Sequence, residues 1–287
     1  MRLLVTGAGG QLGRELGDLA AASGHTVAAL DRSGCDITDE ASVRRALDEH
    51  TPDAVVNCAA WTRVDAAESD PDGAFLVNAI GPRLLAGVCA RRDILLTHVS
   101  TDYVFGGDAD HPLDEWTPTS PRSVYGWSKL AGEDEVRDLA PRHQVVRTSW
   151  LYGRDGPNFV LTMLRAADAG RALRVVDDQV GCPTWTGHLA PTLLDLVGRG
   201  TAGTFHLSNS GSTSWHGFAE EIFRATRREV AVEPIPTSAY PTPAPRPRYS
   251  VLDNRAWRLL GGTPLPDWRE GVAAYVATLP GGGAVIG

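Results

Sequence analysis

Two side chains on one predicted helix could together carry acid–base chemistry. Tyr125 and Lys129 lie four residues apart in the stretch SVYGWSKLAG, so a helix would place them on one face. Lys129 is the only lysine in the chain, and all other members of the 27 Lys and Arg residues are arginine. An ordinary tyrosine has a pKa of about 10, and a nearby ammonium lowers this pKa by stabilising the phenolate. The pair therefore predicts a phenol that acts as a general acid or base near neutral pH.

The Tyr-x-x-x-Lys spacing alone is a weak signal, because a tyrosine and a lysine on a solvated helix face give the same pattern. Its context strengthens it. Thr101 directly follows the apolar stretch DILLTHVS, which predicts a strand, and NCAAWT ends another predicted strand. Because ligands bind at the carboxyl ends of strands in doubly wound sheets, we expect these loops and the Tyr125–Lys129 helix to meet there.

A glycine-rich turn opens the chain. The stretch TGAGGQLG places Gly7, Gly10 and Gly13 between a predicted strand and a predicted helix. Glycines let the backbone turn tightly and approach a pyrophosphate, whose charge then lies at the helix N-terminus. A turn without a ligand is the alternative, but the strand–turn–helix context favours dinucleotide binding.

Asp31 ends the second predicted strand, about 18 residues after Gly13, and Arg32 follows it. A carboxylate at this place binds the ribose hydroxyls of NAD, whereas an arginine pairs with the 2′-phosphate of NADP. Both residue types are present, so this pair leaves the choice between NADH and NADPH open. Asp36 and Ile37 follow a short loop, and they either flank the adenine or form an ordinary surface turn.

The elements that must position these residues alternate along the first half of the chain. Apolar stretches predict strands at 2–6, 25–31, 53–60, 93–100 and 144–150, and the segments between them predict helices at 10–24, 39–50, 71–92 and 123–139. This alternation predicts an α/β fold with a Rossmann-like, doubly wound parallel sheet that helices cover on both faces.

After residue 150 the pattern becomes less regular and indicates a smaller C-terminal α/β domain. Helices are predicted at 157–170, 186–198, 214–227 and 268–278, with a strand near 204–208. We expect residues 1–150 to form an NAD(P)-binding Rossmann domain, with a returning segment near 186–200, and residues 151–287 to form the substrate domain. The proline-rich segment 234–250 would, by composition alone, be a linker or a disordered stretch.

Composition narrows the class of protein. A 43% hydrophobic content is typical of a globular protein, and scattered arginines with a net charge of −8 argue against a nucleic-acid partner. We see neither a signal peptide nor an apolar run near the roughly 18 residues of a membrane span, so we expect a cytoplasmic protein without a membrane partner. The four distant cysteines and the eight histidines show no metal-ligand spacing, so we expect no metal.

These stretches together resemble the extended short-chain dehydrogenase/reductase family, and in detail the dTDP-4-dehydrorhamnose reductases. The matching stretches are TGAGGQLG, NCAAWT, VSTDYVF and YGWSK, and then AAWTRVDAAESDP, VVRTSWLYG, NFVLTMLR, VDDQVGCPTW, FHLSNSGSTSWHGFA and PTSAYPTPAPRPRYSVLDN. The resemblance covers nearly the whole chain. It implies NADPH-dependent reduction, with NADH as the alternative cofactor, of the C4 ketone of dTDP-4-dehydro-6-deoxy-L-mannose to dTDP-L-rhamnose, by a monomer or homodimer.

The resemblance also implies roles for individual residues. Thr101, Tyr125 and Lys129 match the catalytic residues. The expected cofactor contacts, those from the turn and the strand end included, are Gly7, Gly10, Gln11, Leu12, Gly13, Asp31, Arg32, Asp36, Ile37, Ala60, Trp61, Thr62, Tyr125 and Lys129. The expected sugar contacts are Thr101, Asp102, Tyr125 and Trp150. Residues 151–287 become a sugar-nucleotide-binding domain, in which 234–250 is an ordered loop beside the substrate. Candidates for the substrate diphosphate are Arg165, Arg174, Arg246 and Arg248.

One difference from a sister family bears on the reaction. In the sister family, the sugar-nucleotide dehydratases, the pattern after the fourth strand resembles Thr-Asp-Glu. This chain has Tyr103 at the position of the glutamate, and the difference favours carbonyl reduction over water elimination. Two alternatives remain. One is a 4-ketoreductase for another dTDP-deoxyhexose in natural-product biosynthesis. The other is a non-catalytic NADP-binding regulatory subunit, similar to those of methionine adenosyltransferase, against which intact Thr101, Tyr125 and Lys129 argue.

Overall fold

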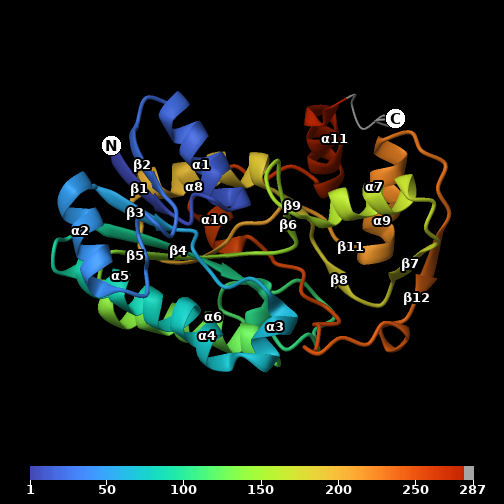
Figure 1. The fold of residues 1–287 in the computed structure, drawn as a ribbon, viewed down its shortest axis with the longest axis horizontal. Helices are drawn as coiled ribbons and strands as arrows, with labels where there is room; N and C mark the ends of the chain where they lie inside the picture. The colour runs from blue at the N-terminus through green and yellow to red at the C-terminus, as the bar shows by residue number, and fades with distance from the viewer. Residues whose placement is uncertain (281–287) are drawn as a thin grey trace.

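A parallel sheet of six strands forms the centre of the protein, whose computed structural model describes residues 1–280 (Figure 1). In spatial order the strands are β10 (Gly203–His206), β5 (His143–Thr148), β4 (Leu95–Thr101), β3 (Ala54–Asn57), β1 (Arg2–Thr6) and β2 (Thr26–Leu30). The strand order reverses between β1 and β3. Such a reversal opens a crevice at the carboxyl ends of the strands, where ligands of doubly wound folds bind.

Helices cover both faces of this sheet (Figure 1). The helices α1 (Gln11–Ala22) and α8 (Thr186–Arg199) pack on one face, and α2 (Glu40–His50), α5 (Gly81–Ala90) and α6 (Val124–Leu139) pack on the other. Each layer buries its own apolar cluster against the strands, and the inner strands β3, β4 and β5 are almost entirely buried on both faces. The predicted fold class is therefore confirmed.

Residues 71–90 form one continuous helix made of α4 (Pro71–Phe75), a π-helical turn (Leu76–Ile80) and α5. By length and composition this helix could cross a membrane, so the expectation that no apolar run approaches that length was wrong. Half of its apolar window is buried inside the protein, and it packs against α6. Its apolar composition is thus explained by its place in the core.

The C-terminal part has a core of its own, built from aromatic side chains between α7 (Phe159–Asp168), α9 (Trp215–Ala225) and α11 (Trp268–Thr278). Around it lie the short strands β6 (Leu151–Tyr152), β7 (Leu173–Val176), β8 (Val180–Gly181), β9 (Thr184–Trp185), β11 (Thr213–Ser214) and β12 (Val232–Ile235). These strands and the short helices α3 (Val64–Ser69) and α10 (Arg255–Leu259) are too brief to show periodicity. The last seven residues of the expected second domain, 281–287, lie outside the described residues.

The proline-rich segment 234–250 is ordered, so the interpretation as a linker from composition alone was wrong. Its backbone is tied to both parts of the protein. Ala244 donates its N–H to Asp65 of α3 at 3.1 Å, and the Arg246 guanidinium pairs with the same carboxylate at 2.8 Å. At the end of the segment Ser250 donates its N–H to the carbonyl of Val180 at 2.8 Å. Its prolines therefore stiffen a bridge between the two parts.

A buried ion pair fastens α6 to the sheet. The Glu133 carboxylate accepts two hydrogen bonds from Arg147 of β5, at 2.9 and 2.7 Å, and one from Ser100 of β4 at 2.6 Å. Burial raises the pKa of Glu133, but the hydrogen bonds and charges of Arg147 and Arg137 outweigh burial and hold it below its usual value. Both members of the pair are almost fully buried, so neither charge has water as a substitute partner.

We expect Glu133→Gln to lower the free energy of unfolding by about 3–5 kcal/mol, because it leaves the Arg147 guanidinium buried without its counter-charge. Denaturant titration measures this loss. Glu135→Gln is the matched control on the same helix, since Glu135 pairs with the exposed Arg83 at 3.0 Å and should matter by less than about 1 kcal/mol. Equal losses in the two variants would show that the buried pair contributes no more to the free energy of unfolding than the exposed pair does.

Candidate active site

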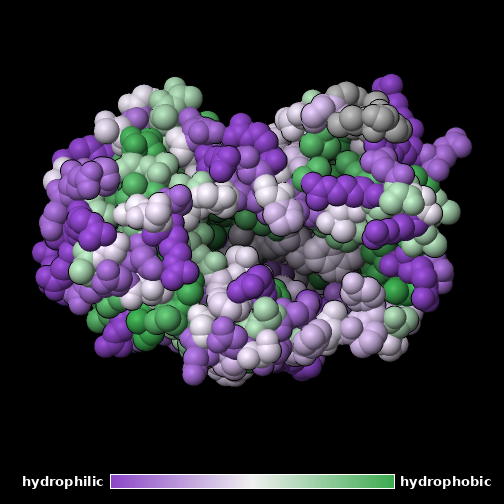
Figure 2. Space-filling model, in the orientation of Figure 1, coloured by the Kyte–Doolittle hydropathy of each residue, from purple (hydrophilic) through white to green (hydrophobic). Residues whose placement is uncertain are grey.

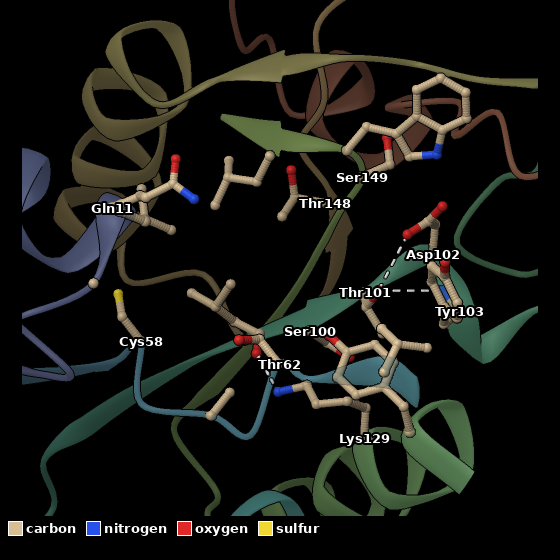
Figure 3. A pocket seen from close by; sticks show the side chains of 18 of the residues that line it. Gln11, Cys58, Thr62, Ser100, Thr101, Asp102, Tyr103, Lys129, Thr148 and Ser149 are labelled. Carbon is tan, nitrogen blue, oxygen red and sulfur yellow. Dashed lines mark hydrogen bonds between the residues drawn. The ribbon is translucent and has the colours of Figure 1, made fainter. Parts of the chain in front are cut away.

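A cavity of about 590 Å³ lies at the carboxyl ends of β1, β3, β4 and β5. Figure 2 shows the surface hollowed where the sheet meets the C-terminal part. The cavity brings together these residues named from the sequence: Gly10, Gln11, Leu12, Gly13, Ala60, Thr62, Thr101, Asp102, Tyr125, Lys129 and Trp150. Four loops that are distant in sequence thus contribute to one space (Figure 3).

The glycine turn forms one end of this cavity. Gly7 has a φ of +67°, and a side chain there would meet the backbone of Ala59. A side chain at Gly13 would collide with the carbonyl of Gly7, so glycine at 13 allows α1 to start directly against the turn. Gly10 caps α1 without any side-chain hydrogen bond, which leaves the first N–H groups of the helix available.

Two polar atoms in the cavity wall have no partner. Gln11 Oε1 and Thr148 Oγ1 are buried and make no hydrogen bond within the part of the chain that the structure describes. Buried polar atoms normally have partners, so these atoms suit a polar ligand. Together with the uncapped start of α1, they fit the pyrophosphate and ribose of a dinucleotide.

Thr101 and Asp102 end β4 at the middle of the cavity. Thr101 Oγ1 donates a hydrogen bond to Asp102 Oδ1 at 3.1 Å and accepts one from the N–H of Tyr103 at 3.2 Å (Figure 3). Asp102 Oδ2 accepts from Ser250 Oγ at 2.6 Å, so the proline-rich segment holds this carboxyl. Burial raises the pKa of Asp102 to about 6, although the hydrogen bonds from Ser250 and Thr101 oppose that rise.

Tyr125 and Lys129 come from the first two turns of α6 and both line the cavity. Burial raises the pKa of Tyr125 to about 12, a hydrogen bond with Thr101 lowers it, and the charge of Asp102 raises it. The expectation that Lys129 lowers the phenol pKa is therefore wrong for the ligand-free protein. Desolvation dominates, and Lys129 Nζ makes its contacts with His98 and Val99 instead.

Lys129 Nζ donates to the backbone carbonyl of Val99 at 2.7 Å and lies 3.3 Å from His98 Nε2. The side chain is 2% exposed. Burial lowers the pKa of Lys129 to about 8, while Glu133 and Cys58 raise it. The lone lysine of the chain is thus a buried amine at the base of the cavity, in contact with the strand that carries Thr101.

Trp150 forms the opposite wall with a residue that sequence reasoning missed. Its indole stacks on that of Trp215, with ring centroids 3.6 Å apart and 6° between the planes. The indole also lies over Gly181, where any side chain would collide with it. Trp150 also adopts a φ of +45°, a strained conformation for a large side chain and one that is found at functional sites.

Six of the residues expected to contact the cofactor lie outside the main cavity: Gly7, Asp31, Arg32, Asp36, Ile37 and Trp61. Gly7 lies in the turn against the backbone of Ala59 and does not line the cavity. Arg32 is largely exposed and pairs with Asp36 at 3.1 Å. Ile37 is buried in the apolar cluster between the sheet and α5, against Gly81, so its side chain serves the core. Trp61 donates its ring N–H to the carbonyl of Arg63.

Asp31 lines a second, adjoining hollow of about 350 Å³. Its Oδ1 accepts hydrogen bonds from the N–H groups of Ser33 and Gly34, at 2.9 and 3.2 Å, which shapes the turn after β2. Arg14 of α1 also lines this hollow, and its guanidinium is 3.3 Å from Asp155. Sequence reasoning missed Arg14, although its position one residue after Gly13 was a usable signal.

Other residues that line the main cavity were not predicted from the sequence to contact the cofactor or the sugar. They are Gly9, Cys58, Val64, Val99, Ser100, Tyr103, Thr148, Ser149, Leu151, Gly156, Pro157 and Trp215. Several of them could have been identified, because they directly precede or follow a named residue at the end of a predicted strand. The four candidate arginines for a diphosphate do not line the cavity, and two of them already pair with carboxylates, Arg246 with Asp65 and Arg174 with Glu233.

The fold and this cavity define a dinucleotide-binding Rossmann protein of the extended short-chain dehydrogenase/reductase class. The model of the family described as the RmlD substrate binding domain matches residues 1–280, and the chain belongs to this family. The resemblance found in the sequence is thereby confirmed.

Individual relatives span nearly the whole chain. A Streptomyces griseus protein named dTDP-4-dehydrorhamnose reductase is 48% identical over 98% of this chain and 94% of its own length. A Streptomyces antibioticus protein, named a probable dTDP-4,6-dihydroxy-2-methyloxan-3-one 4-ketoreductase, is 49% identical over 94% of this chain and 92% of its own. The crystal structure of a Bacillus anthracis dTDP-4-dehydrorhamnose reductase in complex with NADP has a TM-score of 0.94, with 38% identity over 97% of this chain and 99% of that one.

The raised pKa of Asp102 predicts a pH effect on stability. Because the folded protein binds this proton more tightly than the unfolded chain does, the contribution of Asp102 is largest at low pH and is lost as the pH rises through about 6. Asp102→Asn cannot titrate. As the pH rises from 4.5 to 7, we therefore expect the wild type to lose about 2 kcal/mol of unfolding free energy relative to the variant. Denaturant titrations at several pH values measure it, and a constant difference would contradict the assigned pKa.

Proposed function

We propose that the protein is an NAD(P)H-dependent 4-ketoreductase of dTDP-linked 4-keto-6-deoxy sugars, which reduces dTDP-4-dehydro-6-deoxy-L-mannose to dTDP-L-rhamnose. The observation that carries this proposal is the single cavity in which the glycine turn faces Thr101, Tyr125 and Lys129. The names of the relatives, which are reductases of dTDP-linked keto sugars, support the substrate class.

The residues that would hold the cofactor follow the cavity wall. Gly10 to Gly13 and the start of α1 receive the pyrophosphate, and Lys129 and Thr62 lie where the nicotinamide ribose would reach. Asp31 and Arg14 face the adenine ribose from the second hollow. When bound, NAD(P)H supplies the hydride that the C4 carbonyl carbon accepts.

The chain's own groups handle the carbonyl oxygen. Tyr125 donates its phenolic proton to that oxygen, and the high phenol pKa keeps this proton in place until negative charge develops on the substrate. The hydroxyl of Thr101, released from Asp102, donates a second hydrogen bond to the same oxygen. Lys129, whose amine is buried in the same wall, stabilises the phenolate that remains.

Binding of the sugar involves the opposite wall. The Trp150 indole, supported by Trp215, offers a flat apolar face to the deoxysugar ring. Asp102, which accepts a hydrogen bond from Ser250, also accepts one from a sugar hydroxyl. Tyr103 packs its ring edge-on against Tyr125, at 5.4 Å between centroids, where a dehydratase would have a glutamate. Carbonyl reduction without elimination follows from this replacement.

The cofactor unit consists of residues 1–150 with the returning segment near 186–200, and residues 151–287 complete the sugar-nucleotide site. The packing of α8 on α1 and the separate aromatic core of the C-terminal part support this division. Both small molecules are nucleotides of the cell interior, which agrees with a cytoplasmic enzyme that needs no nucleic acid or membrane. A monomer or a homodimer suits this reaction equally well.

A second candidate is a 4-ketoreductase for a different dTDP-deoxyhexose, which the 49% identity to the Streptomyces antibioticus protein favours. The two candidates differ only in the sugar. An NADPH-oxidation assay with dTDP-4-dehydro sugars of both stereochemical series separates them. No oxidation with any of these sugars would overturn both.

We expect Tyr125→Phe to lower turnover by about 100-fold or more, since a general acid contributes roughly 10²–10⁴-fold. Binding of NADPH, measured by fluorescence titration, should change little, because the hydroxyl serves the reaction. Trp127→Phe is a control on the exposed face of the same helix and should keep its activity. Normal turnover in Tyr125→Phe would remove the tyrosine from the proposed chemistry.

We expect Arg14→Ala to weaken NADPH binding about tenfold more than NADH binding, because it removes a charge-assisted hydrogen bond of roughly 1.5–3 kcal/mol to the 2′-phosphate. Arg32→Ala should have a smaller effect, since the Arg32 guanidinium points to Asp36 at the surface. Ratios of the two dissociation constants, measured for both variants, decide which arginine selects the cofactor. A larger effect of Arg32→Ala would reverse the assignment.

A further inference from the structure

A chain of buried hydrogen bonds runs behind Lys129 from the first strand to α6. Thr6 Oγ1 donates to Asn57 Oδ1 at 2.7 Å, and Asn57 Nδ2 lies 3.0 Å from His98 Nδ1. On the other side of the imidazole, His98 Nε2 lies 3.3 Å from Lys129 Nζ. All four side chains are buried, so their donors and acceptors must find partners within the protein.

One backbone N–H group fixes the direction of these hydrogen bonds. The N–H of Ala59, which can only donate, points to Asn57 Oδ1 at 3.2 Å. If the Asn57 amide were reversed, its NH₂ group would face that N–H, and two donors would oppose each other. Asn57 therefore presents its NH₂ group to His98.

The orientation of Asn57 determines the tautomer of His98. Because the NH₂ group can only donate, His98 Nδ1 must accept. Burial holds the pKa of His98 well below its usual value, so the imidazole is neutral and carries its one hydrogen on Nε2. That hydrogen points to Lys129 Nζ.

We propose that His98 is a positioning residue that presents an N–H donor to Lys129 and thereby favours the neutral amine in the ligand-free protein. An ammonium has three hydrogens and no lone pair, whereas a neutral amine accepts one hydrogen bond and still donates to Val99. The role of Lys129 in the reaction rests on the proposed function, but its protonation in the empty protein does not.

The other groups around Lys129 offset the effect of burial only in part. Glu133, one turn further on α6, is already paired with Arg147 and Arg137. Burial raises the pKa of the Cys58 thiol to about 12, so this neighbour is neutral. The phenol of Tyr125 is also neutral near pH 7, for the same reason.

A linkage between cofactor and proton follows from this arrangement. The diphosphate of a bound dinucleotide brings negative charge to the cavity, and negative charge favours the ammonium form of a lysine. Binding of the cofactor would therefore take up a proton above the pKa of the empty site. Affinity would fall by up to tenfold per pH unit in that range.

The lone lysine allows a direct test. Protein labelled with ¹³C at the lysine Cε gives a single lysine signal, whose titration in the ligand-free protein reports the pKa of Lys129. We expect a midpoint at least one unit below the usual value of about 10.4, and a rise of about one unit, or 1.4 kcal/mol, in His98→Leu. His206→Gln, at another buried histidine that does not contact Lys129, is the control and should leave the midpoint unchanged. An ordinary wild-type midpoint, or the same midpoint in His98→Leu, would overturn the proposal.

A second measurement needs no substitution and covers the case in which His98→Leu fails to fold. Nitrogen-15 spectra of labelled histidine distinguish a ring protonated at Nε2 from one protonated at Nδ1. His98 should show the Nε2–H pattern, and the Nδ1–H pattern would overturn the proposal. Because neither experiment uses a substrate, failure of the proposed reaction would be seen separately in the NADPH-oxidation assay.

Discussion

The buried ion pair between Glu133 and Arg147 is the constraint on which the geometry of the site depends. It holds α6 against β4 and β5 at a point one helical turn from Lys129 and one residue before Thr148. The phenol, the amine and the strand ends reach one cavity only while this helix keeps its register on the sheet. A charge pair is specific in this respect, because apolar contacts alone would tolerate sliding more readily than a bidentate hydrogen-bonded pair does.

The same desolvation changes each titratable group of the site in a direction set by its charge. Burial disfavours charged forms, so it raises the pKa of Asp102 and Tyr125 and lowers that of Lys129. Burial therefore brings the pKa of Asp102 and that of Lys129 to within about one unit of pH 7 and keeps the Tyr125 phenol protonated. A charged ligand that enters would meet groups whose protonation is easily altered, which is the condition under which proton transfer is efficient.

The fold was largely predictable because its signals are local. Strand and helix periodicity identified the parallel sheet, the turn around Gly10 followed from adjacent residues, and the spacing of Tyr125 and Lys129 placed both on one face. Contacts between distant segments gave no such signal: Ser250 reaches Asp102 across 148 positions, and Trp215 of α9 stacks on Trp150, which lies between β5 and β6. Local patterns also cannot reveal how far burial shifts a proton equilibrium, which is why the expected effect of Lys129 on the phenol was wrong.

The burial of Lys129 also has a consequence for the chemistry of the protein surface. Lysine acetylation and ubiquitination both require an accessible primary amine, and the only lysine of this chain is 2% exposed. Arginine meets the need for surface cations and does not react in this way. The folded enzyme would therefore escape lysine-directed modification altogether, and any reagent that does reach its lysine must have entered the cavity first.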